Sequence, residues 1–338
     1  MIELSICIPT YNFGNFIGQT LDSIIPNLTD EVEVIILDGG STDDTEQVVS
    51  QKQQISPQIY YHRQNYRGGI DRDISKAISL ASGNYCWPFS ADDIMMPGAV
   101  NALLPLIRSN FDIYLCEHTV CDVEMRPVKY FSYFMDIKKP ESFDLGNKSQ
   151  RLRYFSQARK THPFFGFLAS VIFKRELWES TEGISDSLND TFYGLAGRLL
   201  SLMADGVELQ YLGEELKLLY YRTGNDSFLE HGAVNRMRIT VEGFFHIADK
   251  IFGEGSPEAF HIKRSVRNEM PLYAILSLKL KTKKSPQQES IEMLNKVVKK
   301  YYSNSGLLSF FKYYIFLLMP FSLLHIFIYI RKAFRTIL

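Results

Sequence analysis

The sequence of residues 84–93 is Asn84-Tyr85-Cys86-Trp87-Pro88-Phe89-Ser90-Ala91-Asp92-Asp93, a short apolar run that ends in two adjacent carboxylates. This pattern predicts a buried strand that delivers acidic side chains to a cleft. In open α/β sheets, ligands bind beyond the carboxyl ends of the strands, where two carboxylates are suited to hold a divalent metal or a sugar hydroxyl. The alternative is that Asp92 caps the helix that follows, with Pro97 near its first turn.

Strands and helices alternate on both sides of this run. The other apolar strands expected in the first half of the chain cover residues 4–8, 32–37, 59–62 and 112–116. Helical stripes separate them, such as the one from Ile70 to Ala81 that stops at Gly83. This alternation predicts an α/β fold with a mostly parallel central sheet and helices on both faces.

The second half of the chain gives a weaker signal. Residues 130–165 lack clear periodicity and are interpreted as irregular structure around a binding cleft. The later elements expected are a strand at Leu168–Phe173, a helix near Thr191–Ala204, and strands at Gln210–Leu212 and Leu216–Tyr221.

Length and cysteine content restrict the class of protein. The 338 residues allow one large domain or two smaller ones. The four cysteines lie mostly in apolar runs and match neither a zinc site nor a disulfide framework, so we expect reduced core thiols in a cytosolic protein. The apolar stretch Leu4–Ile8 is too short for a secretory segment, and we expect that the protein is not exported.

Charge is distributed unevenly along the chain. The formal net charge is −1, but residues from Lys279 onward carry eleven Lys or Arg and two Glu, so the body is acidic and the tail is basic. A basic tail indicates nucleic acid or an anionic membrane surface as partner. Here the basic residues flank an apolar segment and no aromatic-studded groove, so no nucleic-acid partner is expected.

That apolar segment runs from Tyr313 to Ile330 without a formal charge and contains Pro320. As a helix it would be about 27 Å long, slightly less than a bilayer core of about 30 Å. Lys or Arg residues stand at both of its ends, which favours a kinked, in-plane or re-entrant segment on the cytoplasmic leaflet over a simple span. The alternative is a buried helix of the globular domain.

Acidic residues recur at the expected strand ends: Asp38, the segment Asp71-Arg72-Asp73, and Asp92-Asp93. Neither a Gly-x-Gly-x-x-Gly motif nor a Walker Gly-Lys-Ser/Thr motif is present, so the phosphate cradles of dinucleotide and P-loop proteins are missing. An acidic edge suits a nucleotide whose diphosphate is neutralised by a metal ion. We expect Asp71 and Arg72 to contact that nucleotide.

Three motifs in order resemble family-2 glycosyltransferases with the GT-A fold, over roughly residues 3–225. They are Pro9-Thr10-Tyr11-Asn12, Leu37-Asp38-Gly39-Gly40-Ser41-Thr42-Asp43-Asp44-Thr45 and Ser90-Ala91-Asp92-Asp93. The resemblance implies that Pro9, Thr10, Tyr11 and Asp38 frame the base and ribose of a nucleotide sugar. It also implies that Asp92 ligates Mg²⁺ or Mn²⁺ at the diphosphate, while Asp93 binds the donor sugar or supports the metal.

The chain departs from the family pattern at two positions. The metal motif of the family usually opens with an acid, and here that position is Ser90. The second acid after Asp38 is often Asp, and here it is Gly39. The segments 68–74 and 85–87 are similar to the abequosyltransferase-like branch, which adds 3,6-dideoxyhexoses to bacterial O-antigen units.

Inverting transfer requires a base that deprotonates the acceptor hydroxyl. The family places this acid at the start of a later helix, and Asp190 is the predicted base, with Asp186 as the second choice; the alternative for Asp190 is a plain N-cap. Arg222, in a segment that resembles the end of the family's domain, is predicted to pair with the diphosphate. Its alternative is a surface salt bridge.

These observations predict three parts: a GT-A domain at 1–228, a helical extension at 229–304 and a membrane-associating tail at 305–338. The expected activity moves a sugar from a CDP- or UDP-linked donor to a polyprenyl-diphosphate-linked glycan at the cytoplasmic face of a bacterial inner membrane. Two alternatives stay open. The transferase acts on another glycan or on a protein, or the chain is an inactive GT-A-like module that binds nucleotide sugar or scaffolds a polysaccharide assembly complex.

Overall fold

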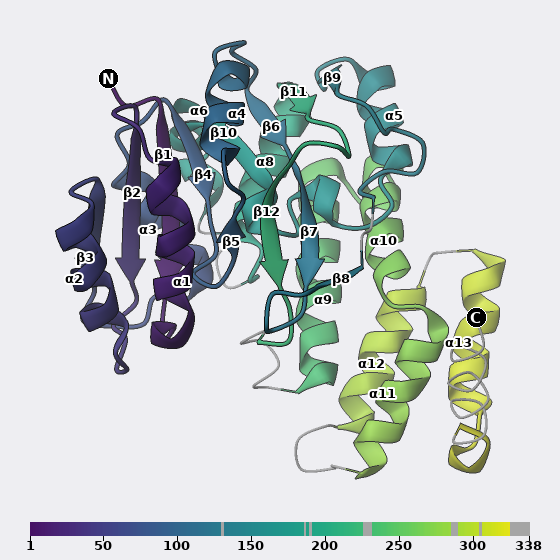
Figure 1. Ribbon diagram of the computed structural model, residues 1–338. Coiled ribbons are helices and arrows are strands. Elements are labelled where there is room, and N and C mark those ends of the chain that lie inside the picture. Colours follow the sequence, from purple (N-terminus) through teal and green to yellow (C-terminus); the bar gives the residue numbers. More distant parts are fainter. Residues whose placement is uncertain are drawn as a thin grey trace. The chain divides into compact units, whose positions relative to one another are not determined.

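A computed structural model of the protein describes residues 1–129, 132–185, 187–188, 191–225, 232–284, 290–303 and 306–324. The chain forms two compact units, Met1–Gly224 and Asn225–Leu338. The first unit is an α/β domain and the second is helical (Figure 1). The second unit includes both the extension predicted for 229–304 and the tail predicted for 305–338.

The first unit is built on an eight-stranded sheet in the order β3-β2-β1-β4-β10-β6-β11-β9. The strands are β1 (Leu4–Thr10), β2 (Val32–Asp38), β3 (Ile59–Arg63), β4 (Tyr85–Pro88), β6 (Ile113–Leu115), β9 (Glu141–Asp144), β10 (Val171–Lys174) and β11 (Glu208–Tyr211). β1 pairs in parallel with β2 and β4, β2 with β3, and β6 with β11. β10 runs antiparallel between β4 and β6, and β9 runs antiparallel to β11.

The sheet is therefore mixed: six strands run in one direction, which agrees with the prediction of a mostly parallel sheet, and β9 and β10 run in the opposite direction. Sequence periodicity finds apolar strands but does not give their direction. Direction depends on the connection, because only a crossover that returns over a face of the sheet can place the next strand in parallel.

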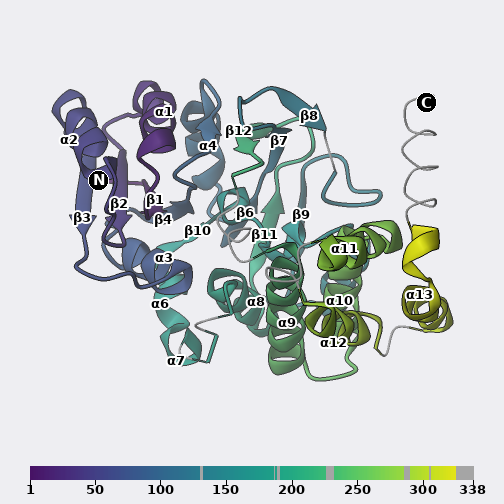
Figure 2. The ribbon, with the colours of Figure 1, turned by 90° about the horizontal axis from the view of Figure 1, so that it is seen from below.

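Helices cover both faces of this sheet. The first four are α1 (Gly14–Ile24), α2 (Thr45–Ile55), α3 (Ile70–Ser79) and α4 (Ala99–Ile107). α1 and α4 lie on one face, while α3 and α8 (Gly194–Asp205) lie on the other (Figure 2). Apolar residues of α1 and α4 join the core formed around Trp87 and Tyr114. On α3, the predicted stripe is buried at Ile74, Ala77 and Ile78.

A second sheet of four short strands extends the domain, and the sequence pattern did not predict it as a sheet. Its order is β5 (Ile94–Met95), β12 (Lys217–Arg222), β7 (Glu117–Cys121) and β8 (Pro127–Lys129). β12 pairs antiparallel with β5 and in parallel with β7. Because β5 follows Asp92 and Asp93 directly, this sheet brings the end of β12 beside the acidic pair.

The stretch 130–165 is more regular than expected within the described residues. It contains β9, α5 (Lys148–Gln157) and the 3₁₀ turn η2 (His162–Phe164). Asn147 caps α5 by accepting hydrogen bonds from the backbone N–H groups of Ser149 and Gln150. The later elements are the 3₁₀ turn η3 (Leu168–Ser170), α6 (Arg175–Ser180) and α7 (Glu182–Ser185).

The second unit consists of helices in its described residues: α9 (Ala233–Phe252), α10 (Pro257–Glu269), α11 (Leu272–Lys284), α12 (Ile291–Tyr302) and α13 (Leu307–Leu318). α9 packs against α10 and α12, and α13 packs against α11 and α12. Ser256 and Ser290 cap α10 and α12 with their hydroxyl oxygens. Within the described part of the chain, no helix combines the length and apolar character needed to cross a membrane.

Lys279 fixes the end of α13. Its Nζ donates to the carbonyl oxygens of Phe316 at 2.6 Å, Leu317 at 3.3 Å and Met319 at 3.1 Å. Pro320 follows these carbonyls and has no N–H to continue the helix, so a buried ammonium satisfies acceptors that the helix end leaves open. Burial lowers the pKa of Lys279.

We expect Lys279→Met to lower the free energy of unfolding of the second unit by about 1–3 kcal/mol, because three carbonyls lose a charged donor. Lys281→Met is the matched control, since Lys281 lies exposed on the same helix. Hydrogen exchange of the amides in residues 307–319 reports the effect. Equal protection in the two variants would contradict a capping role for Lys279.

Candidate functional site

The carboxyl ends of β1, β2 and β4 form one edge of the large sheet, and most predicted site residues lie there. Thr10 and Asp38, the last residues of β1 and β2, are direct partners in the parallel register. Pro9 pairs with Leu37 one step earlier. Asp92 and Asp93 follow shortly after β4, which is the other neighbour of β1. The fold therefore brings together the three motifs that are far apart in the sequence.

Asp38 is fully buried at this edge and orders the turn that follows β2. Its Oδ1 accepts hydrogen bonds from the backbone N–H and the hydroxyl of Ser41, each at 2.7 Å. Its Oδ2 accepts from the hydroxyl of Tyr61 at 2.5 Å. Burial and this bond to Asp38 raise the pKa of Tyr61. Asp38 thus orders the turn at this edge of the sheet, and a direct contact with the ribose stays a prediction.

Asn12 joins the first two motifs. It adopts a left-handed backbone conformation with φ of 57°, which Asn tolerates better than most residues. Its N–H donates to Ser41 Oγ, and its Oδ1 accepts from the backbone N–H of Thr42, each at 2.8 Å. Asp43 extends this connection by accepting from Gly14 N at 2.9 Å. These hydrogen bonds therefore join the turns after β1 and β2 into one preformed surface.

Tyr11 belongs to the turn after β1, and its ring lies beneath Arg67. The guanidinium carbon of Arg67 is 4.3 Å from the centre of the Tyr11 ring, a cation–π contact. Close by, Thr10 Oγ1 is buried without a hydrogen-bond partner among the described residues. Arg67 carries no motif signature, so the sequence interpretation missed it.

Asp92 and Asp93 have different environments. Asp92 is half-buried, whereas Asp93 is fully buried. Asp93 Oδ1 accepts from the backbone N–H of Arg222 at 2.9 Å, and its Oδ2 has no hydrogen-bond partner within the described residues. Burial and the adjacent Asp92 carboxylate raise the pKa of Asp93 well above its ordinary value, while Arg222 and the hydroxyl of Ser90 act in the opposite direction.

The alternative that Asp92 caps the next helix is excluded by the local structure. β5 follows the acidic pair, and α4 begins only at Ala99. The N-cap residue of α4 is Gly98, with φ of 77°.

Arg222 braces the acidic pair from the second sheet. It is 3% exposed, which excludes the alternative of a surface salt bridge. Its Nε donates to the carbonyl oxygen of Asp92 at 2.8 Å, its Nη2 to Gln19 Oε1 at 2.8 Å, and its Nη1 to the carbonyl oxygen of Val123. These contacts fix the Asp92–Asp93 turn, and a contact of Arg222 with the diphosphate stays a prediction.

Asp71 connects α3 to the start of α8. Its Oδ2 accepts from Phe192 N at 2.9 Å and its Oδ1 from Gly194 N at 2.8 Å. A side chain at Gly194 would meet Asp71, because an added Cβ would lie 3.0 Å from the carboxyl carbon. Asp71 therefore holds the segment that follows Asp190. Asp190 and Asp186 themselves lie outside the described residues.

Arg72, next to Asp71 on α3, is exposed and donates a long hydrogen bond of 3.4 Å to the carbonyl oxygen of Gly68. Its side chain is therefore not committed to the core, in contrast to that of Asp71. The predicted contact of Arg72 with the nucleotide stays a prediction.

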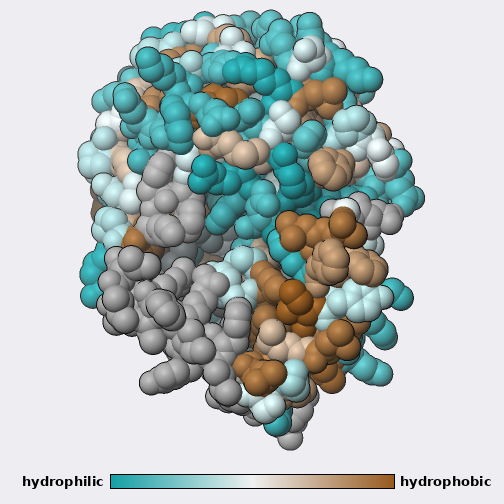
Figure 3. Space-filling model, turned by 90° about the vertical axis from the view of Figure 1, so that its right-hand side faces the viewer, coloured by the Kyte–Doolittle hydropathy of each residue, from teal (hydrophilic) through white to brown (hydrophobic). Residues whose placement is uncertain are grey.

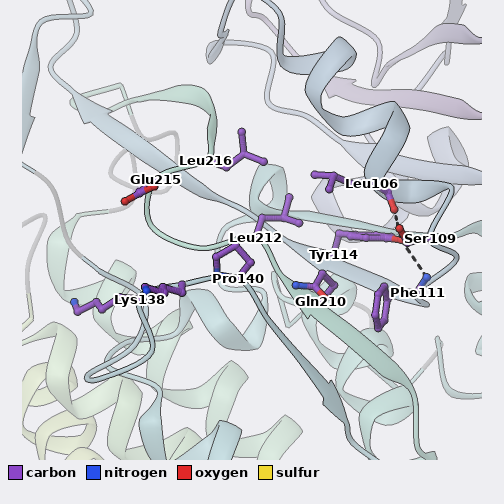
Figure 4. Close-up of a pocket in the computed structure, with 11 residues that line it drawn as sticks. Leu106, Ser109, Phe111, Tyr114, Lys138, Pro140, Gln210, Leu212, Glu215 and Leu216 are labelled. Atoms are coloured by element: carbon purple, nitrogen blue, oxygen red, sulfur yellow. Dashed lines mark hydrogen bonds between the residues drawn. The ribbon is translucent and has the colours of Figure 1, made fainter.

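A separate pocket of about 540 Å³ lies between the end of α4 and the segment before β9 (Figure 4). Apolar side chains such as Leu106, Phe111 and Tyr114 form its wall. The hydroxyl of Tyr114 accepts from Phe111 N and donates to the carbonyl oxygen of Leu106. None of the predicted site residues that the structure describes lines this pocket, so it is distinct from the acidic edge.

We expect Asp71→Ala to lower the free energy of unfolding by about 1–2 kcal/mol, because two backbone N–H groups at the start of α8 lose their acceptor. Amide exchange at Phe192 and Gly194 should rise in the variant. Lys76→Ala, an exposed position on the same helix α3, is the control. Unchanged exchange at both amides would show that Asp71 does not hold this segment.

The chain is 29% identical to an abequosyltransferase of Salmonella typhimurium over 287 residues, which cover 81% of this chain and 83% of the relative. The fold is similar to that of S. aureus TarS 1–349 in complex with UDP-GlcNAc, with a TM-score of 0.60 and 18% identity over 89% of this chain and 82% of that one.

A mannosyltransferase from Pyrobaculum calidifontis, in complex with GDP-Man and Mn²⁺, has a TM-score of 0.51 and 18% identity over 91% of this chain and 77% of that one. These likenesses support a GT-A-like α/β fold for the first unit. The model of the family "Glycosyl transferase family 2" matches residues 5–175. The chain belongs to glycosyl transferase family 2, and it is a transferase of sugars.

Proposed function

We propose that this transferase moves a sugar from a CDP- or UDP-linked donor to a polyprenyl-diphosphate-linked glycan at the cytoplasmic face of a bacterial inner membrane. The observation that carries the proposal is the Asp92–Asp93 pair, which lies beyond β4 at the edge that also holds Thr10 and Tyr11. Asp93 Oδ2 is buried there without a hydrogen-bond partner among the residues that the structure describes, as expected for an atom whose partner is a ligand.

The acidic pair fits a divalent metal that the donor helps to bind. Asp92 and Asp93 offer the oxygen ligands that Mg²⁺ and Mn²⁺ prefer. In the described part of the chain, no three His, Cys, Asp or Glu side chains are grouped as a complete metal site. A site of one or two carboxylates is typical of Mg²⁺ that takes its other ligands from substrate phosphates and water. Asp92 would hold the ion, with Asp93 behind it.

The proposed reaction is an in-line displacement at the anomeric carbon. The acceptor hydroxyl oxygen forms the new bond to that carbon as the bond to the diphosphate oxygen breaks, and a base takes the hydroxyl proton. Asp190 is the proposed base. The contacts of Asp71 with Phe192 and Gly194 would hold the backbone just beyond it. A bound metal would neutralise the charge that develops on the leaving diphosphate.

The proposed donor sugar is a 3,6-dideoxyhexose such as abequose. The similarity to an abequosyltransferase supports this choice, because it extends over most of both chains. A sugar that lacks the hydroxyls at C3 and C6 requires a less polar pocket than an ordinary hexose.

The proposed site of action at a membrane rests on α13. Large apolar side chains on this helix are exposed, among them Leu307 at 73%, Leu308 at 67% and Leu318 at 76%. Apolar residues gather in one region of the surface shown in Figure 3. Lys312 lies on the same helix, so an apolar surface with basic residues is available to an anionic leaflet.

We expect calorimetric titration of CDP or UDP to show tighter binding with Mn²⁺ than without it, and this gain to disappear in Asp92→Ala. The expected loss is about tenfold or more in affinity, as for one charge-assisted contact. Asp30→Ala, an exposed carboxylate on the surface, is the matched control. If Asp92→Ala binds as the wild type does with Mn²⁺, a metal role for Asp92 is excluded.

We expect the double variant Leu308→Glu/Phe311→Glu to float with anionic vesicles at least about tenfold less than the wild type, because two exposed apolar side chains are lost. Ile55→Glu on α2 controls for added charge, since Ile55 is 65% exposed on the first unit. Vesicles of phosphatidylglycerol and phosphatidylcholine supply the surface. If the double variant and the control float equally, α13 is not the contact.

A further inference from the structure

We infer that the Asp73 carboxylate binds the base of the donor nucleotide. This carboxylate occupies the space that a side chain at position 39 would fill. The inference rests on the proposed function, because it requires that the acidic edge binds a nucleotide sugar. Asp73 lies on α3, whereas position 39 belongs to the turn after β2.

The space beside Gly39 is filled by the carboxylate of Asp73. A Cβ added at Gly39 would lie 2.8 Å from Asp73 Oδ2 and 3.6 Å from its carboxyl carbon. The backbone does not require glycine at this position, because Gly39 is not among the residues with positive φ, in contrast to Gly40 with φ of 81°. Glycine at position 39 therefore leaves the space that the Asp73 carboxylate occupies, and a side chain there would require that carboxylate to move.

Gly39 itself is fixed at the nucleotide edge. Its N–H donates to the carbonyl oxygen of Thr10 at 2.9 Å, which ties the turn to the end of β1. A carboxylate that occupies the side-chain space of position 39 thus lies beside Thr10 and Tyr11. The carboxylate that the family often carries at position 39 is in this way supplied by another element of the chain.

The Asp73 side chain is held in one orientation. Gln64 Nε2 donates to Asp73 Oδ1 at 2.8 Å. Gly68 makes room on the other side, because an added Cβ there would lie 2.3 Å from Asp73 Oδ1. Two glycines and one amide thus define the position of a carboxylate that is 5% exposed.

A buried carboxylate is costly and is usually retained for a contact that uses it. Burial raises the pKa of Asp73, although Gln64 and Arg67 partly oppose this effect. Tyr11 and Arg67 provide a flat aromatic and cationic surface nearby, which suits a nucleobase. A carboxylate oxygen accepts N–H groups, and both candidate bases offer one: the N3–H of uracil and the N4 amino group of cytosine.

The test moves the carboxylate from α3 back to the turn after β2. Titrations of CDP and UDP are compared for the wild type, Asp73→Ala, Gly39→Asp and the double variant Gly39→Asp/Asp73→Ala. Asp73→Ala should weaken binding about ten- to hundredfold, which corresponds to one charge-assisted hydrogen bond. Gly39→Asp alone should also weaken binding, because its side chain meets Asp73. The double variant should recover affinity to within about threefold of the wild type.

Dideoxy nucleotides separate the base from the ribose. If Asp73 reads the base, Asp73→Ala weakens 2′,3′-dideoxy-UDP and UDP by the same factor. If the effect disappears with the dideoxy compound, the ribose is the ligand and the inference is wrong. Asp73→Asn keeps the shape of the side chain and removes its charge, so it should also weaken UDP binding, through loss of the charge assistance to the hydrogen bond, even if the alanine variant is unstable.

Lys76→Ala, exposed on the same helix, is the control and should bind like the wild type. A wild type that binds neither CDP nor UDP would contradict the proposed function. A wild type that binds, with unchanged affinity in Asp73→Ala, would contradict this inference alone. Failure of the double variant to recover, with both single variants folded, would also overturn it.

Discussion

The parallel pairing of β1 with β2 and β4 is the constraint on which the site depends. Parallel strands end at the same edge, so Thr10, Asp38 and the run that leads to Asp92 arrive together although they are separated by tens of residues. The two turns are then joined through Asn12 and Ser41. The polar groups at this edge are held by strands that are buried along their whole length, which limits how far any of them can move.

The acidic residues of this edge have different tasks, although they look alike in the sequence. Asp38 stabilises the turn after β2 through Oδ1 and accepts a hydrogen bond from Tyr61 of β3 through Oδ2, whereas Asp71 holds the start of α8. Asp93 has one acceptor oxygen left for a ligand, since Oδ1 has a backbone donor and Oδ2 has no partner in the described residues. A cluster of carboxylates is therefore not one site. Local hydrogen bonds decide which of them remain available for substrate.

The sequence predicts features that depend on the pattern of a short segment and does not predict those that depend on how distant segments are arranged in space. Strand ends at Asp38 and Asp92 and the helical stripe on α3 could be predicted, because period and polarity are properties of short segments. The small second sheet and the direction of β10 could not, since both depend on how distant segments pair. The position of Asp73 against Gly39 and of Arg67 over Tyr11 is also tertiary. No spacing along the chain indicates either contact.

Thr10 Oγ1 and Asp93 Oδ2, which have no hydrogen-bond partner in the described part of the chain, affect the stability of the free domain. A buried polar atom without a partner costs about 1–3 kcal/mol, so this domain is less stable than its packing alone would allow. A ligand that forms a hydrogen bond with either atom recovers part of that free energy, so ligand binding and folding become linked equilibria. The resting enzyme would thus tolerate fewer destabilising substitutions than the occupied one, and cellular supply of its ligand would set how much of it survives.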